Sequence, residues 1–435
     1  MKNLTKELIK LLKSVSTHGL PNIFRTKYLP IRLVWIFLTI VSIIITIILV
    51  IQTFTEYFEY RVNIDYRLIE SNDEETPIIL ICNKNKLSTK YGYEYLKSII
   101  KKSNSSNNLH PFWKSYDIVK YLIKNLQAYE LFYGLSWNEI KNSTKSFDEM
   151  FISAFSKLNL LNRSHFDWIF NKRYGNCFRL NFNSNIKFSN GMDNGVRIEL
   201  FLGQMNELNK LGIEKGIYLS ILDKSTNPFN DLDHVINVKA GVETLIQINK
   251  EIYEKYPYPY SNCKIVEPSE SIYYDEIIKS NYSYSKSLCL DYCYLDLLKK
   301  RDNCSLLMNS IHFIENHQNE SYCKNESFNF FNLWLLFSGV NLKFCQEQCP
   351  FECKQIKYSS YVTTNKYDFT LKMQNDSMID WSTMIEDKSR PENDFVYLNI
   401  HFHTLNYIHY EEIPAVSFIN FISNLGGVIS LFLGK

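Results

Sequence analysis

The stretch from Leu33 to Ile51 constrains the fold of this chain more than any other feature, because it holds nineteen consecutive residues without a charge. A helix rises about 1.5 Å per residue, so this run would cover roughly 28 Å, close to the hydrocarbon thickness of a bilayer. A core helix normally keeps a polar stripe, and a signal peptide has a shorter apolar core with a cleavage site after it. Neither pattern is present, so the run predicts a transmembrane helix, which we assign to residues 33–55.

The charges on either side of this run predict its direction. Residues 1–32 carry seven basic side chains and one acidic side chain, Glu7, whereas the residues after Ile51 mix both signs. Basic side chains accumulate on the cytoplasmic side of a membrane span. The bias therefore predicts a cytoplasmic N-terminus and places the chain after Ile51 outside the cell.

The cysteines fit an extracellular location. All ten lie beyond the apolar run, and an even number in an oxidising compartment favours disulfides over a zinc site. Cys289 and Cys293 are four residues apart, as are Cys345, Cys349 and Cys353, so each row faces one way on a helix. Two antiparallel rows would form a ladder of bridges, although spacing alone does not establish the connectivity. The nested order that this suggests is Cys263–Cys353, Cys289–Cys349, Cys293–Cys345 and Cys304–Cys323, which leaves Cys82–Cys177.

Eight Asn-x-Ser/Thr sequons fall in the same region and predict glycosylation there. The net charge of +2 argues against nucleic acid or another polyanion as a partner. No metal motif, nucleophile elbow or paired catalytic carboxylate stands out, so we predict no metal, no cofactor and no enzyme. The sequons begin at Asn104, Asn142, Asn162, Asn281, Asn303, Asn319, Asn325 and Asn375.

Hydrophobic periodicity predicts an α+β ectodomain between these landmarks. Strands are expected at residues 61–68, 76–83 and 196–202, and further strands lead to an extended, proline-containing loop at residues 256–263. Helical spacing runs from Ile118 to Phe132 and stops at Gly134. A second helix is predicted from Phe147, Phe151, Phe155 and Leu158.

The last predicted strand has two different faces. Val396, Leu398, Ile400 and Phe402 form one face, and Tyr397, Asn399, His401 and His403 form the other. The two histidines could bind a metal or sense protons, but we interpret their face as solvated.

A second uncharged run follows from Pro414 to Gly434. It contains Asn424, Gly426, Gly427 and Ser430. Small and polar residues in a membrane helix pack against other helices or line water.

The order of several short motifs resembles the degenerin/epithelial sodium channel superfamily, which includes acid-sensing ion channels and the insect pickpocket proteins. The resemblance runs from Ser16 to Gly434, and its motifs lie in the same order and membrane placement as in that family. They are Ser16-Thr17-His18-Gly19, Pro77 through Cys82-Asn83, Tyr174-Gly175-Asn176-Cys177, Tyr260-Ser261-Asn262-Cys263, the row Cys345, Cys349-Pro350 and Cys353, and Gly426-Gly427-x-x-x-Leu431-Phe432-Leu433-Gly434.

The resemblance implies an amiloride-sensitive, voltage-independent sodium channel subunit in the plasma membrane. Such a subunit has two transmembrane helices flanking one disulfide-rich ectodomain of palm, finger, thumb, knuckle and β-ball. It forms homo- or heterotrimers with related subunits, in contact with lipid and sodium ions. The implied divisions are residues 1–32 cytoplasmic, 33–55 first membrane helix, 56–413 ectodomain and 414–435 the start of the second helix. Within the ectodomain the finger covers about 84–170, the thumb about 265–355, and palm strands lie near 60–82 and 395–405.

The resemblance also implies roles for single residues. His18 and Gly19 match a His-Gly motif that governs gating, and Ser423 matches the position where bulky substitutions hold degenerin channels open. Gly426 and Gly427 belong to the pore helix, and Gly434 matches the first residue of the Gly-x-Ser selectivity constriction. Tyr57 and Tyr260 lie near the aromatic pair that couples thumb to membrane helix in acid-sensing channels.

The chain departs from the family pattern at several positions. Ser430 replaces a common glycine, Asn424 stands where many members have an acidic residue, and Leu306 replaces one cysteine of a Cys-x-Cys pair. Lys435 occupies the middle of the selectivity triplet, and the distal part of the second helix is missing. We therefore expect either a fragment or a subunit that cannot complete a pore.

Two other function classes remain open from the sequence. A single-pass type II receptor or adhesion ectodomain would fit if residues 414–434 were not a pore helix. A membrane-anchored hydrolase is the third reading, and no catalytic motif supports it. The resemblance implies a ligand- or mechanically gated channel, since proton, peptide and mechanical gating all occur within this one fold.

Overall fold

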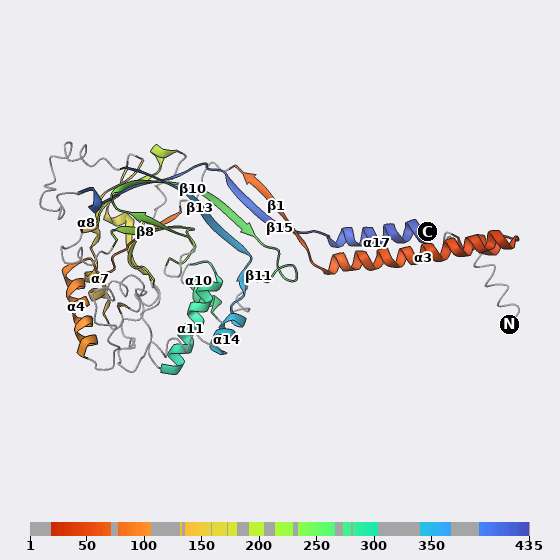
Figure 1. Ribbon diagram of the computed structural model, residues 1–435, viewed down its shortest axis with the longest axis horizontal. Coiled ribbons are helices and arrows are strands. Elements are labelled where there is room, and N and C mark those ends of the chain that lie inside the picture. Colours follow the sequence, from red (N-terminus) through yellow and green to blue (C-terminus); the bar gives the residue numbers. More distant parts are fainter. Residues whose placement is uncertain are drawn as a thin grey trace. The chain divides into compact units, whose positions relative to one another are not determined.

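The structure is a computed structural model that divides into two compact units (Figure 1). The helical unit consists of Met1–Asp65, Glu254–Cys263 and Glu411–Lys435, and the sheet unit consists of Tyr66–Tyr253 and Lys264–Tyr410. The structure describes residues 19–70, 77–105, 131–132, 135–157, 159–171, 173–180, 191–203, 214–228, 234–265, 273–279, 282–302, 340–366 and 391–434.

The helical unit is built on α3 (Leu29–Phe58), a helix of 30 residues that contains the whole predicted apolar run. A proline in its first turn fits the helix start, because the missing N–H would have no partner there. At about 1.5 Å per residue α3 is roughly 45 Å long. Within the described residues it is the one helix that is long and apolar enough to cross a membrane.

Two shorter helices accompany α3. The short helix α2 (Leu20–Arg25) precedes it, and α17 (Phe418–Leu433) is an apolar helix of 16 residues that runs beside α3 (Figure 1). The Ser417 side chain caps α17 by accepting a hydrogen bond from the backbone N–H of Asn420 at 3.1 Å.

The larger sheet has eight strands. Its central strand β14 pairs in parallel with β10 and antiparallel with β7, so Ile400 lies beside Ile246 on one side and Val196 on the other. The order is β1 (Val62–Ile69), β15 (Tyr407–Pro414), β10 (Val242–Glu254), β14 (Phe395–Phe402), β7 (Val196–Phe201), β3 (Phe151–Ser156) and β4 (Asn159–Leu160), and β13 (Lys354–Lys366) also pairs with β10.

The second sheet has five antiparallel strands. Its middle strand β2 is buried at all six residues, which agrees with the continuous apolar run at residues 77–82. The order is β5 (Phe166–Asn171), β6 (Gly175–Leu180), β2 (Ile78–Asn83), β8 (Gly216–Leu222) and β9 (Val235–Lys239); β11 (Cys263–Lys264) and β12 (Phe351–Glu352) form a separate pair.

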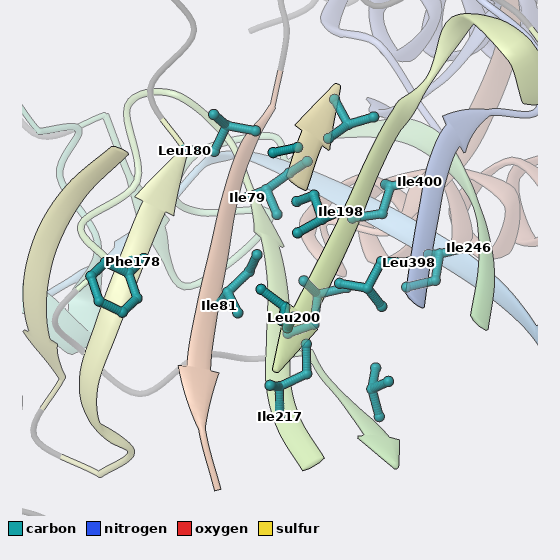
Figure 2. Close-up of a cluster of buried hydrophobic side chains, with 14 of the residues drawn as sticks. Ile79, Ile81, Phe178, Leu180, Ile198, Leu200, Ile217, Ile246, Leu398 and Ile400 are labelled. Atoms are coloured by element: carbon teal, nitrogen blue, oxygen red, sulfur yellow. The ribbon is translucent and has the colours of Figure 1, made fainter. Parts of the chain in front are cut away.

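The main hydrophobic core draws on both sheets (Figure 2). Ile79 and Ile81 from β2, Ile198 from β7 and Ile400 from β14 are each completely buried. Alternate residues of a strand share one face, so these strands contribute every second side chain to the core.

The remaining elements are short helices and 3-10 turns. Two of the described α-helices among them begin with a capping box, in which Glu139 pairs with Ser136 and Glu149 with Ser146. The bounds are α4 (Lys90–Ser105), α7 (Trp137–Ser143), α8 (Phe147–Met150), η2 (Arg163–His165), η3 (Met192–Asn194), α10 (Tyr274–Lys279), α11 (Lys286–Asp302), α14 (Val340–Gln348) and η4 (Pro391–Asp394).

The predicted strands at residues 61–68, 76–83, 196–202 and 396–402 are confirmed as β1, β2, β7 and β14. The predicted β1 face is largely exposed: Ile64, Tyr66 and Leu68 are between 65% and 73% exposed. β1 shares its sheet with β14, whereas β2 lies in the five-stranded sheet. Residues 118–130 and Gly134, where a helix was expected, lie outside the described residues.

The predicted helix from Phe147 to Leu158 is wrong beyond Met150. The helix α8 covers only Phe147–Met150, and the chain then extends as β3, antiparallel to β7. The rings of Phe147 and Phe151 stack at 4.3 Å across this change, so their four-residue spacing marked a real contact. Hydrogen bonding to β7 outweighs the local helical spacing in the following residues.

The prediction of a solvated face on β14 is also wrong. Asn399 is 4% exposed and His401 is 3% exposed, because β14 lies between two strands and is overlaid by η3. The Nδ2 of Asn399 donates a hydrogen bond to the Met192 carbonyl in that turn, at 3.3 Å. His403, beyond the strand, is exposed as expected.

Candidate functional site

The two apolar helices meet at an aromatic cluster near one end of α3. Phe421, the buried residue of α17, stacks on Tyr57 with ring centroids 4.3 Å apart and meets Phe54 edge-on at 5.1 Å. Offset and edge-to-face ring pairs of this kind contribute about 0.5–1.5 kcal/mol each beyond the area they bury. The cluster therefore fixes the start of α17 against the end of α3.

A tyrosine pair continues from this cluster. Tyr60 has a positive φ of 50°, which turns the chain directly after α3. Its ring meets Tyr260 edge-on at 5.3 Å, and Tyr260 in turn meets Tyr256 at 5.0 Å. Burial, followed by the neighbouring tyrosines, raises the pKa of Tyr260, so the phenol stays neutral at physiological pH.

Tyr57 and Tyr260, the residues expected near the coupling pair, are connected through Tyr60, whose ring lies 6.4 Å from Tyr57 and 5.3 Å from Tyr260. Tyr260 contacts Tyr60, while Tyr57 contacts α17. The backbone N–H of Tyr256 donates to Oε2 of Glu412 at 3.0 Å, which links the same loop to the chain leading into α17. Tyr60 and Phe421 were not predicted from the sequence. The run of aromatic residues around Tyr57 was the pattern that could have indicated a ring cluster there.

One face of α17 lies towards α3. Phe421, Leu425, Val428 and Phe432 follow each other at steps of four, three and four residues, and all are buried or half-buried. Phe421 and Phe432 both have contacts with α3.

The opposite face of α17 is small and polar. Ser423, Gly427 and Ser430 share this face at steps of four and three residues, Asn424 and Gly426 lie beside them, and all five are exposed. A Cβ added at Gly426 or Gly427 would meet nothing within 4 Å. Gly434 directly follows the helix with a φ of 74° and a ψ of 172°, so the helical path ends there.

Gly19 is held against α3 at a position that requires glycine. Its φ of 90° disfavours any other residue, and an added Cβ would collide with the Thr39 hydroxyl. Thr39 is 8% exposed, which is unusual for α3. His18, the other half of the predicted gating motif, lies outside the described residues.

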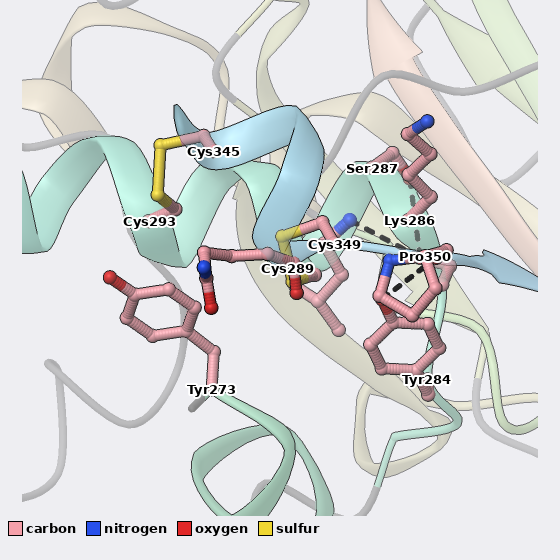
Figure 3. Close-up of a disulfide and its surroundings, with 12 residues drawn as sticks. Tyr273, Tyr284, Lys286, Ser287, Cys289, Cys293, Cys345, Cys349 and Pro350 are labelled. Carbon is pink, nitrogen blue, oxygen red and sulfur yellow. Dashed lines mark hydrogen bonds between the residues drawn. A yellow bond between two sulfur atoms is a disulfide. The ribbon is translucent and has the colours of Figure 1, made fainter. Parts of the chain in front are cut away.

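The ladder region contains two disulfides, one from α11 to α14 and one from α11 to Cys349, the residue directly after α14 (Figure 3). They join Cys289 to Cys349 and Cys293 to Cys345, and all four residues are completely buried. The expected helical row of three cysteines is therefore wrong beyond Cys345, because α14 ends at Gln348 and the chain continues as the strand β12 before Cys353. A third bridge joins Cys82 on β2 to Cys177 on β6. These are three of the five expected pairs; Cys263 and Cys353 are also disulfide-bonded, and Cys304 and Cys323 lie outside the described residues.

Hydrogen bonds support the base of this ladder. The Tyr284 hydroxyl donates to the Pro350 carbonyl at 2.8 Å, and Glu352 accepts from the Lys286 N–H at the start of α11 at 3.0 Å. A carboxylate there also interacts favourably with the helix dipole. The two helices are thus tied at their ends as well as by their disulfides.

The structure describes the side chains at two of the predicted glycosylation sites. Asn142 and Asn162 are both exposed, as a glycan requires. Asn104 belongs to α4, and the other five sequons lie outside the described residues.

No group of three metal-ligating side chains occurs among the described residues. His401 lies beside Gln247 on β10, and burial, followed by the charge of His403, lowers its pKa. Within the described part of the chain its Nδ1 has no hydrogen-bond partner. His401 is therefore a buried neutral imidazole at neutral pH.

Comparison with known proteins gives a consistent result. Residues 11–435 match the family described as "Amiloride-sensitive sodium channel". The epithelial sodium channel subunit beta of Homo sapiens is 25% identical over 329 residues, which cover 71% of this chain and 49% of that protein. Subunit alpha of Homo sapiens is 26% identical over 294 residues, covering 64% of this chain and 41% of that protein. The chain spans about half the length of the curated relatives it matches.

Among solved structures, the cryo-EM structure of a proton-activated chloride channel covers 91% of this chain and 91% of its own chain. The TM-score is 0.33 at 6% identity, which is too low to support an argument about fold or function.

Proposed function

The chain belongs to the amiloride-sensitive sodium channel family, and on this premise we propose that it is a sodium channel subunit of the plasma membrane. The family is one of ion channels, not of enzymes. We further propose that the channel is a trimer of this subunit or of this subunit with relatives, and that amiloride blocks it.

The observation that carries this proposal is the small and polar face of α17. Ser423, Gly427 and Ser430 point away from α3 and are exposed, while the other side of the same helix packs on α3. Polar side chains are costly in lipid, so such a face belongs against other helices or around water. Several copies of α17 around a common axis would satisfy it and would enclose an ion path.

The proposed topology follows from the two apolar helices and from the charges before the first of them. α3 and α17 are the two membrane segments, the basic N-terminus lies in the cytoplasm, and residues 56–413 lie outside. The proposed finger covers about 84–170, and α11 and α14 belong to the proposed thumb at about 265–355. β1 and β14 are the proposed palm strands.

The proposed gating residues are His18, Gly19 and Ser423, and Gly434 marks the proposed selectivity constriction. The collision that any side chain at Gly19 would have with Thr39 supports a role for this glycine in holding the N-terminal segment to α3. The contacts of Tyr60 with Tyr260 and of Tyr57 with Phe421 support a coupling role for this cluster.

The test is whole-cell current in oocytes that express the full-length subunit, alone and with related subunits. We expect a sodium current that amiloride blocks. Ser423→Val should raise the standing current, because the added methyl groups crowd the small face in the closed state, whereas Ile422→Val on the neighbouring surface should not. A surface-expressed subunit without current in any combination would favour the receptor class instead.

A further inference from the structure

A polar cavity of about 290 Å³ lies in the sheet unit, where the chain after β8 meets the start of α11 and the strand β13. Its walls are formed by residues 221–227, 283–287 and 352–358, together with His234. Ligand pockets commonly measure about 300–1,000 Å³, so this cavity is at the small end of the range. Its size therefore fits a ligand no larger than a single amino acid.

Hydrogen bonds hold the walls of the cavity together. The backbone N–H of Ser283 donates to the Ser225 carbonyl at 2.7 Å, and the hydroxyls of the same two residues lie 3.1 Å apart. The Tyr284 hydroxyl donates to the Pro350 carbonyl at 2.8 Å (Figure 3). Because the protein makes these bonds within itself, the walls are pre-organised, which lowers the entropic cost of binding a ligand.

Asp223 contributes a buried carboxylate to this cavity. Its residue is 6% exposed, and its Oδ2 accepts from the backbone N–H and the hydroxyl of Ser225 at 3.0 and 2.5 Å. Within the described part of the chain, no donor bonds to its Oδ1 and no basic side chain forms an ion pair with it. Buried carboxylates are normally paired with a cation, so the cation that fits here is one that a ligand brings.

Two lysines of β13 contribute the opposite charge. Lys354 and Lys357 line the cavity, and neither forms an ion pair among the described residues. The Lys357 Nζ lies 5.6 Å from the centroid of the Tyr253 ring, a contact that leaves its N–H donors available to an anion. Glu352, the second carboxylate of the lining, already accepts from the Lys286 N–H. The lining thus holds two carboxylates and two ammonium groups, a combination that a ligand with both charges complements better than a simple anion or cation.

We propose that this cavity binds a free amino acid. The ammonium group of the ligand binds to the Asp223 carboxylate, and its carboxylate binds to the ammonium groups of Lys357 and Lys354. The hydroxyls of Ser225 and Tyr284 in the lining add hydrogen-bonding groups around the ligand. This binding does not depend on ion conduction, so it can be measured on the purified chain.

The first test is calorimetric titration of the detergent-purified full chain with each of the proteinogenic amino acids. At least one should bind saturably, with one site per chain. Its N-acetyl and carboxamide derivatives each lack one charge and should bind about tenfold more weakly, the effect of one lost hydrogen bond to a charged group. The proposal is overturned if none of the amino acids binds saturably, if both derivatives bind as tightly as the parent, or if uncharged glucose binds instead.

The second test removes the charges of the protein. Asp223→Asn and Lys357→Met should each weaken binding about tenfold. The matched controls Asp193→Asn and Lys300→Met make the same changes outside the cavity, on side chains that are 93% and 70% exposed, and should bind as the wild type does. Wild-type affinity in both cavity variants, or an equal loss in the controls, would contradict the site. Thermal unfolding without amino acid establishes that each variant is folded, and Lys357→Met carries the test if Asp223→Asn does not fold.

The two tests combined fix the orientation of the ligand. In Asp223→Asn, acetylation of the ligand amine should have little further effect, because its partner is already lost, whereas amidation of the ligand carboxylate should keep its full effect. Lys357→Met should show the reverse. A merely structural role of these residues would leave both derivatives with their full effect in both variants, and that result would overturn the proposed contacts.

Discussion

The two units of this chain differ in how they place isoleucine, which is buried in the sheet unit and exposed on α3 of the helical unit. Ile79 and Ile198 in the sheet unit are completely buried, whereas Ile44 and Ile47 on α3 are 51% and 53% exposed. Three described disulfides lie within the sheet unit, while among the described residues α3 and α17 meet through an aromatic cluster and a side-chain hydrogen bond. The sheet unit thus has its own core, whereas the apolar side chains of α3 lie largely on the surface of the helical unit.

This contrast has a functional consequence. A cross-linked core resists local rearrangement, because its contacts are numerous and mutually dependent. Two helices joined by a few aromatic and polar contacts can shift when those contacts change. We therefore expect changes in the sheet unit to alter folding and surface delivery, and changes at the helix contacts to alter current.

The largest effect should come from the disulfide ladder. Cys349→Ser opens the bridge to Cys289, which spans 60 residues, and should cost about 2–5 kcal/mol of folding free energy. Surface biotinylation should then show retention of the subunit inside the cell. The double variant Cys289→Ser with Cys349→Ser controls for the free thiol and should be retained equally; normal surface delivery of both would contradict a structural role for the ladder.

The same substitution at a buried and at an exposed isoleucine tests the difference in burial between the two units. Ile198→Val removes one methylene from a completely buried side chain and should lower the unfolding free energy by about 0.5–1.5 kcal/mol. Ile44→Val makes the same change on the exposed surface of α3 and should have little effect. Thermal unfolding of the detergent-purified protein measures both, and equal shifts would remove the distinction between the units.

Much of this contrast could be predicted from the sequence. The uncharged run of α3, the buried strand β2 and the alternating strand β14 follow directly from hydrophobic periodicity. The four-residue cysteine spacing likewise indicated that the cysteines of α11 and those in and directly after α14 would face each other.

The remaining features depend on contacts between distant residues. β3 follows helical spacing in sequence but forms a strand because β7 offers it hydrogen bonds. His401 looks like a surface residue until η3 and the neighbouring strands cover its face. The links of Tyr60 to Tyr260 and of Ser42 to Phe432 join positions that no local pattern relates.

The aromatic cluster offers a test of the helical unit. Phe421→Ala removes the ring that stacks on Tyr57 and meets Phe54, a loss of about 0.5–1.5 kcal/mol per ring pair. The current amplitude should change severalfold while surface abundance stays near that of the wild type. Phe37→Ala, which removes a largely exposed ring of α3 away from the cluster, is the control; a collapse of surface abundance in Phe421→Ala alone would assign the ring to folding instead.

The smallest expected effect concerns pH and the sheet unit. The pKa of His401 is lowered from its ordinary value of 6.5, so just below that value the unfolded chain binds a proton that the folded chain does not. Stability should therefore fall as the pH drops below about 6.5 and should be unaffected by this group above it. His401→Gln should flatten this part of the unfolding temperature profile, and the exposed His403→Gln should not; identical slopes in all three proteins would count against a buried neutral imidazole.

The proposed channel function requires that the small face of α17 lines a water-filled ion path. The direct measurement is the block of sodium current by a water-soluble, cationic thiol reagent on single-cysteine variants of this helix. Ser423→Cys and Gly427→Cys should be modified and blocked, while Ile422→Cys, which is 51% exposed on a different surface, should be unaffected. A current that persists in Ser423→Cys, or an equal block in Ile422→Cys, would contradict the assignment of this face to the pore.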